Sequence, residues 1–184
     1  MKSLAARLGG DEDLWETIGI LHDIDFELVH GDMQLHGAKG AGILGKHGID
    51  PALAGIVQRH NHSLYSETYT RPVEIALQAA DSASGVVTAC ALVKGGRLSD
   101  VTVKIVTKKA KEKPFAAGCD RSRIALIAPI LALPDFYAVA IGGLMGIHKR
   151  TGSGLIMWNW RKRIRTSRIN RTSRYYDQPG PAEK

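Results

Sequence analysis

The chain has 184 residues, of which 44% are hydrophobic and 23% are charged. This composition excludes a wholly disordered chain and fits one globular domain with its own core. The net charge is +7, but residues 148–184 hold ten Lys or Arg and only two acidic residues. That segment carries +8 and residues 1–147 carry −1, so the charge does not mark the main domain as a nucleic-acid-binding protein.

Six sites with short polar side chains mark the helix starts that we expect in residues 1–150, because each offers an oxygen to the free amides of a first turn. In chain order they are Asp11, Asp32, Asp50 with Pro51, Thr70, Ser99 with Asp100, and Asp120. Glycines at positions 9–10, 48 and 95–96 mark expected helix ends. Apolar residues recur between these marks at spacings of three and four, as at Leu14, Ile18 and Leu21. The pattern predicts an all-α, compact bundle of six or seven short helices.

Two segments within this domain leave alternatives open. Residues 101–106 alternate apolar and polar side chains at first and are β-branched except at Lys104, as in a strand, although the lysines that follow favour a helix with a solvated face. Residues 124–147 are apolar over a length that raises the question of a membrane span. Because Pro129, Pro134 and Asp135 interrupt that stretch, we predict two short packed helices and no membrane span.

Residues 151–184 differ from the preceding domain in composition. The motif Arg165-Thr166-Ser167-Arg168 recurs at residues 171–174, and no apolar period runs through this region. We predict a basic, poorly ordered C-terminal tail. Tryptophans and tyrosines among its arginines would also suit stacking on single-stranded nucleic acid, so any nucleic-acid binding is expected through this tail only.

The remaining composition indicates the cellular compartment. The two cysteines, Cys90 and Cys119, are too few for a disulfide framework in a chain of this size. The first residues lack the charged-then-apolar pattern of a signal peptide. We therefore expect a cytoplasmic protein.

Polar residues continue several of the apolar stripes that should face the core. They are His22, Asp23, His36, His60 and Asp81. One such histidine is ordinarily a hydrogen-bonded core residue, but burying aspartates as anions costs several kcal/mol unless they pair or bind a cation. Imidazole and carboxylate together form a ligand set for Zn, Mn or Fe, so a metal centre inside the helical bundle explains all of these positions.

Two further patterns are weaker. Residues 40–47 fit a phosphate-binding loop up to the last position, where His47 replaces Ser or Thr. Such a loop needs a strand before it, whereas this stretch lies in a helical period that places His36 and His47 along one side, so we interpret its glycines as helix-packing positions. The lysines between positions 104 and 113 suit either an anionic substrate or a solvated helix face.

Four short segments carry a family resemblance: Leu21-His22-Asp23-Ile24-Asp25, His36-Gly37, Arg59-His60-Asn61 and Ala79-Ala80-Asp81. In this order they resemble the HD-domain metal-dependent phosphohydrolases, especially the small bacterial group with an HDIG-like signature. The resemblance covers residues 4–118 and, less closely, continues to residue 147. It implies a divalent metal at His22, Asp23 and Asp81, and a second metal at His36 and His60 in binuclear members.

One position departs from the family pattern. The family's first ligand is a histidine on a helix some tens of residues before the His-Asp pair, and no histidine precedes His22 in this chain. Residues 1–8 resemble the second half of that helix. The departure predicts either that the start was placed too late or that a ligand has been lost.

The leading functional hypothesis is a metal-dependent phosphohydrolase for a small phosphorylated substrate, either a phosphomonoester or a nucleotide-type compound. One or two divalent ions (Mn, Fe, Zn or Mg) would activate a water for attack on phosphorus, with Asp23 as the catalytic ligand. The alternative is a degenerate, catalytically impaired HD fold. It would serve as a binding module whose tail at residues 151–184 engages nucleic acid or anionic surfaces.

Overall fold

The structure is a computed structural model that describes residues 1–65 and 69–151. The described residues form eight α-helices and one 3-10 turn, and they contain no strand. The elements are α1 (Lys2–Leu8), α2 (Glu12–Leu21), α3 (Ala38–Lys46), α4 (Pro51–Arg59), α5 (Pro72–Val93), η1 (Leu98–Asp100), α6 (Val103–Lys111), α7 (Arg121–Ala125) and α8 (Leu133–Thr151). The all-α prediction is confirmed, with one helix more than expected. The basic tail predicted for residues 151–184, and its alternative as a nucleic-acid surface, fall outside the described residues apart from position 151.

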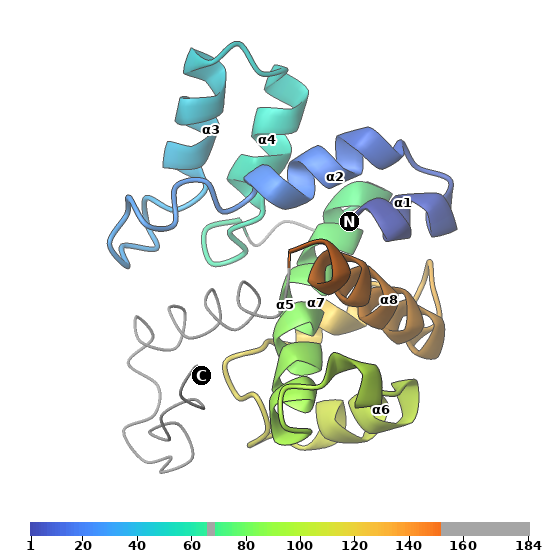
Figure 1. Cartoon of the computed structure of the whole chain (residues 1–184). Coiled ribbons are helices and arrows are strands. Elements are labelled where there is room, and N and C mark those ends of the chain that lie inside the picture. Colours follow the sequence, from blue (N-terminus) through green and yellow to red (C-terminus); the bar gives the residue numbers. More distant parts are fainter. Residues whose placement is uncertain (66–68, 152–184) are drawn as a thin grey trace, which may run out of the picture.

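The helices pack around α5, which runs through the middle of the molecule (Figure 1). Helices α6, α7 and α8 pack along α5, and α1 packs against both α2 and α8. Helices α3 and α4 form an antiparallel pair at one end. The core side chains of α5 include Leu77, Val86 and Val87, which are fully or almost fully buried.

Helix α5 is the one described helix that is long and apolar enough to cross a membrane by those criteria alone. Of its apolar window, 67% is buried inside the protein, as expected for the central helix of a bundle. The other apolar stretch, at residues 124–147, is divided into α7, a series of turns, and α8, as predicted, but α8 is not short: it has 19 residues and contains Pro134 and Asp135 in its first turn.

Several predicted helix starts are confirmed by capping hydrogen bonds. The carboxylate of Asp11 accepts from the Leu14 amide at 2.9 Å, and that of Asp50 accepts from the Ala52 amide at 2.8 Å. Asp120 caps α7 in the same way. Two predictions are displaced: α5 begins at Pro72 without a side-chain cap from Thr70, and α6 begins after Thr102 instead of after Asp100. Residues 103–111 are helical, which decides between the two alternatives for that segment.

The predicted core stripe of α2 is wrong at one position. Leu14 is 40% exposed, whereas Trp15 is 5% exposed and joins the core with Ile18. Spacing alone did not distinguish these residues, because Leu14 and Trp15 each have an apolar side chain at a helical interval from Ile18. The large indole ring packs closely over Gly10, where an added Cβ would lie 2.7 Å from a ring carbon.

The helix predicted to follow Asp32 begins only at Ala38, and residues 22–37 form a series of turns. The Asp32 carboxylate accepts from the Gln34 amide at 2.9 Å, which closes a local turn instead of capping a helix. As a result His36 lies before α3 and is buried, while His47 is exposed at the end of α3. The prediction that these two histidines share one side of a helix is wrong.

The start of α3 is capped from elsewhere in the chain. The carboxylate of Asp25 accepts hydrogen bonds from the backbone amides of Gly37 and Gly40, each at 2.7 Å. Gly37 has a φ of +85°, and a Cβ at this position would lie 2.6 Å from the carbonyl oxygen of Gln58. Both features require glycine at position 37. This capping places His36 directly before α3 and beside Asp25.

Candidate metal centre

The structure brings together the five residues that the sequence singled out: His22, Asp23, His36, His60 and Asp81. We call these five residues the candidate metal centre. His22 ends α2 and Asp23 follows it, while His60 ends α4. His36 comes from the turns before α3, and Asp81 comes from α5. The centre therefore lies where the ends of α2 and α4 meet the side of α5.

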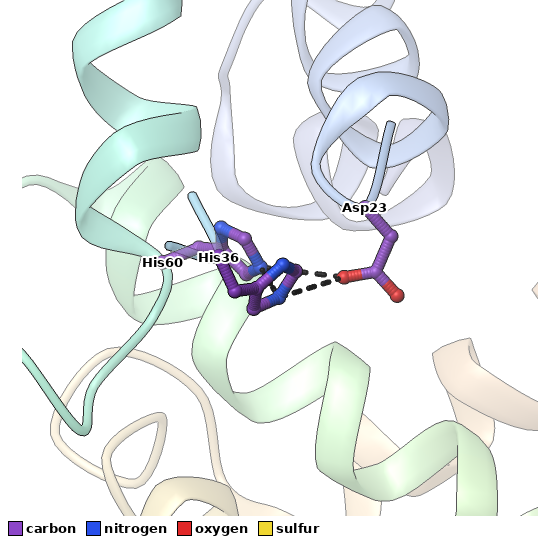
Figure 2. Close-up of side chains that lie close together, drawn as sticks. All are labelled: Asp23, His36 and His60. Carbon is purple, nitrogen blue, oxygen red and sulfur yellow. Dashed lines mark hydrogen bonds and ion pairs between the residues drawn. The ribbon is translucent and has the colours of Figure 1, made fainter. Parts of the chain in front are cut away.

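Asp23 occupies the middle of this cluster. Its Oδ1 atom lies 3.6 Å from His22 Nε2, 3.5 Å from His36 Nε2 and 3.3 Å from His60 Nε2. Figure 2 shows His36 and His60 pointing toward the Asp23 carboxylate. Asp81 approaches from α5, with its Oδ1 atom 3.8 Å from His22 Nε2. Two groups of possible ligands thus share Asp23: Asp23 with His36 and His60, and Asp23 with His22 and Asp81.

The Nδ1 atoms of the three histidines, which point away from Asp23, each contact an oxygen atom. Nδ1 of His22 lies 2.9 Å from the carbonyl oxygen of Gly19, and Nδ1 of His60 contacts the carbonyl oxygen of Val57. Nδ1 of His36 lies 2.9 Å from Asp25 Oδ1. Because carbonyl and carboxylate oxygens only accept, each Nδ1 carries the proton and donates. In the neutral imidazoles, each Nε2 therefore presents a lone pair to the cluster.

This arrangement leaves Nε2 lone pairs without donors, and it fits a cation. Nε2 of His36 and Nε2 of His60 face each other at 3.0 Å, and neither carries a proton when Nδ1 is the donor. Nε2 of His22 is buried and has no hydrogen-bond partner among the described residues. Its contacts with Asp23 and Asp81 are at ion-pair distances that are too long for hydrogen bonds. Three imidazoles and two carboxylates are a suitable donor set for a divalent transition metal.

Asp25 is a residue of the site to which the sequence assigned no role. Its side chain is 0% exposed, and its two oxygens receive the His36 ring N–H and the amides of Gly37 and Gly40. Asp25 thus orients His36 and caps α3 at the same time. Carboxylates behind metal-binding histidines fix the tautomer in this way. The available signal was its place two residues after Asp23, between the apolar residues Ile24 and Phe26.

Arg123 of α7 is a second residue of the site that sequence reasoning missed. Its Nη1 atom lies 3.1 Å from Asp81 Oδ2, and its Nε atom donates to Gln78 Oε1 at 2.6 Å. Gln78 in turn donates to the carbonyl oxygen of His60 at 2.9 Å. The spacing of residues in the sequence could not predict this contact, because α7 and α5 are brought together only by the tertiary fold.

The other polar residues weighed from the sequence belong to neither of the two ligand groups. His62 is 41% exposed on its side chain and lies 3.9 Å from Asp120. Residues 40–46 are part of α3 and no strand precedes them, which confirms that this stretch is not a phosphate-binding loop. Lys104, Lys108 and Lys111 line an open groove beside α6, together with Pro134, and no residue of the candidate metal centre contributes to it.

The histidines predict a pH dependence that differs between metal-free and metal-loaded protein. Burial lowers the pKa of His22 and of His36, but the carboxylates around them outweigh burial, so the net pKa of each is raised above 6.5. Folding thus favours protonated histidine in the metal-free protein. We expect the stabilisation from these two groups to be present in full below pH 6.5 and the free energy of unfolding to fall as pH rises through the raised pKa values. Divalent metal competes with these protons, so metal affinity should rise over the same interval.

Urea denaturation with a chelator, from about pH 6.5 to pH 9, measures this dependence. His62→Gln is the matched control, because burial lowers the pKa of His62 and that residue contributes with the opposite sign. The fall in stability should persist in this variant. A metal-free stability that is flat or rises with pH would contradict the expected protonation.

Comparison with known families agrees with this geometry. The HD domain family model matches residues 1–85, a segment that contains α1 to α4 and the first part of α5. All five residues of the candidate metal centre lie within it, whereas Arg123 lies outside. Neither the comparison with curated proteins nor that with solved structures gives a match. The match over residues 1–85 is consistent with a member of the HD domain family, a superfamily of metal-dependent phosphohydrolases.

Proposed function

We propose that the protein is a phosphohydrolase that uses one or two divalent metal ions to hydrolyse a small phosphorylated substrate. The observation that carries the proposal is the convergence of three imidazole Nε2 atoms on Asp23, with each Nδ1 proton directed away from the cluster. A purely structural histidine cluster would be expected to pair its ring nitrogens with donors or acceptors. The orphaned Nε2 of His22 leaves that pairing incomplete.

The residues have separable roles in this proposal. Asp23 belongs to both ligand groups, so it would hold either ion and connect the two positions. His36 and His60 would complete one position, while His22 and Asp81 would complete the other. A divalent ion held there would supply a water of lowered pKa and positive charge beside the phosphoryl oxygens.

The surroundings keep these side chains in place. Asp25 holds the His36 ring, and the carbonyl oxygens of Gly19 and Val57 hold those of His22 and His60. Because the acceptors lie on backbone or on a fully buried side chain, the three rings have little freedom to rotate. Such preorganisation reduces the rearrangement needed when a ligand binds.

The proposal predicts a metal-containing hydrolase. Purified protein should contain about one or two equivalents of a transition metal, and added Mn²⁺ should restore hydrolysis to chelator-treated protein. Metal analysis combined with a panel of phosphomonoesters and nucleotides measures both properties. His22→Gln and His60→Gln address the two ligand groups separately, so in a binuclear protein each should lose about one equivalent.

His47→Gln is the matched control for these variants, because His47 is exposed at the end of α3. It should retain the metal and the activity of the unmodified protein. Protein without stoichiometric metal, and without hydrolysis of any member of the panel in Mn²⁺, would overturn the proposed function.

A further inference from the structure

The guanidinium group of Arg123 is held on two of its three nitrogens. Nε donates to Gln78 Oε1 at 2.6 Å, and Nη1 lies 3.1 Å from Asp81 Oδ2. Gln78 and Asp81 are three positions apart on α5, so they lie on one face of that helix. The arginine side chain is 12% exposed. Its position is therefore fixed by two partners on a single helix face beside the candidate metal centre.

The third nitrogen of the guanidinium, Nη2, is buried and has no hydrogen-bond partner among the described residues. A buried donor on a charged group is unfavourable when it is left unpaired. The pairing of α7 with α5 is already achieved by Nε and Nη1, so a structural role does not explain Nη2. Because both terminal nitrogens are bonded to the same carbon atom, Nη2 also lies within a few ångström of Asp81.

We propose that Arg123 binds the phosphoryl group of the substrate, with Nη2 donating to a phosphoryl oxygen held at the candidate metal centre. This inference rests on the proposed function and adds to it the residue that recognises the anionic group. A guanidinium donates in a fixed plane and remains charged at all physiological pH values, which suits phosphate oxygens. Arg123 supplies this positive charge from α7, outside the segment that matches the HD domain model.

In this role the contact between Arg123 and Asp81 has a function, which is to orient the guanidinium. The carboxylate fixes the plane of the guanidinium and so fixes the direction of the free Nη2 protons. Gln78 adds a second constraint and connects Arg123 to the backbone of His60. A substrate oxygen would thus meet an arginine that is already oriented, which lowers the entropy lost on binding.

Binding of inorganic phosphate tests this role directly. Isothermal titration of phosphate is carried out on the unmodified protein and on Arg123→Met, each with and without Mn²⁺, and metal content is measured on the same samples. We expect Arg123→Met to weaken phosphate binding by about 10- to 100-fold, the range for a lost hydrogen bond from a charged group. The KM of any hydrolysed substrate should rise by a similar factor, with metal content unchanged.

Two further variants keep the test decisive. Arg123→Lys retains the charge but loses the planar pair of donors, and it should bind phosphate more weakly than the unmodified protein and more tightly than Arg123→Met. If Arg123→Met does not fold, the Lys variant carries the test. Arg97→Met removes an arginine from an exposed ion pair with Asp100, beyond the far end of α5, and should leave phosphate binding unchanged.

The outcomes separate this inference from the proposed function. Unchanged phosphate affinity in Arg123→Met, or absence of phosphate binding in the unmodified protein, overturns the role of Arg123 even when the protein contains metal and hydrolyses substrates. Loss of metal from Arg123→Met without a change in phosphate affinity also overturns it, because Arg123 then acts on Asp81 alone. Absence of metal and of hydrolysis overturns the proposed function, whereas Arg123-dependent phosphate binding would still support an anion site.

Discussion

Replacing Asp23 with Asn is expected to remove most of the bound metal and to lower kcat/KM by at least about 100-fold. Substitution of the outer partners of metal ligands alone lowers affinity or activity by about 10- to 100-fold, and Asp23 belongs to both ligand groups. Asparagine has nearly the same shape but no negative charge, so the three surrounding imidazoles would lack their central anion. Metal analysis and steady-state kinetics in Mn²⁺ measure the two effects.

The fold should survive this substitution, because the Asp23 side chain is 24% exposed and shares no packing role with the core. Circular dichroism and thermal unfolding of the metal-free variant check this point. Asp13→Asn is the matched control, since the Asp13 side chain is 91% exposed and its carboxylate pairs with Lys2. A folded Asp23→Asn protein with a full complement of metal would show that the cluster is not the metal site.

Replacing Asp25 with Ala should lower the free energy of unfolding by about 3–5 kcal/mol, the range observed when one partner of a buried charged pair is removed. The substitution leaves the amides of Gly37 and Gly40 and the ring N–H of His36 without their acceptor inside the protein. Urea denaturation of the metal-free protein at pH 7 measures the loss. Asp50→Ala is the matched control, because Asp50 accepts a capping bond at the exposed start of α4 and its loss should cost about 0.5–2 kcal/mol.

Asp25→Asn separates stability from metal binding. One amide oxygen cannot accept all three hydrogen bonds, and the amide NH₂ group would face donors. This variant should be less destabilised than Asp25→Ala, yet its metal affinity should fall by about 10- to 100-fold because the His36 ring loses its fixed orientation. If Asp25→Ala proves no less stable than Asp50→Ala, the buried carboxylate does not organise the start of α3.

Local chemistry explains the parts of the fold that could be predicted. Asp11, Asp50 and Asp120 cap helices as expected, because a capping bond joins residues two or three apart and needs no tertiary contact. The stripes of α4 and α5 predicted the buried faces that lead to His60 and Asp81. The periodicity failed at Asp32, where residues 22–37 form turns and the amides of α3 bind a carboxylate from twelve or more positions earlier.

The candidate site was predictable in its composition and not in its support. His22, Asp23, His60 and Asp81 follow apolar stripes, on which polar residues require partners. His36 was assigned to such a stripe too, but it lies in the turns before α3. Their supporting residues, Asp25, Gln78 and Arg123, have no such local signature. Gln78 and Arg123 are 45 positions apart, yet their side chains are hydrogen-bonded.

The residues alone predict an all-α domain in which histidines and aspartates follow apolar helix stripes. Periodicity and capping decide these properties within a few residues of each position. The packing of the helices determines which ring nitrogens face inward, that Asp25 holds both His36 and α3, and that Arg123 reaches Asp81. These features depend on distances between helices that are remote in sequence, and such distances follow from how the whole core packs.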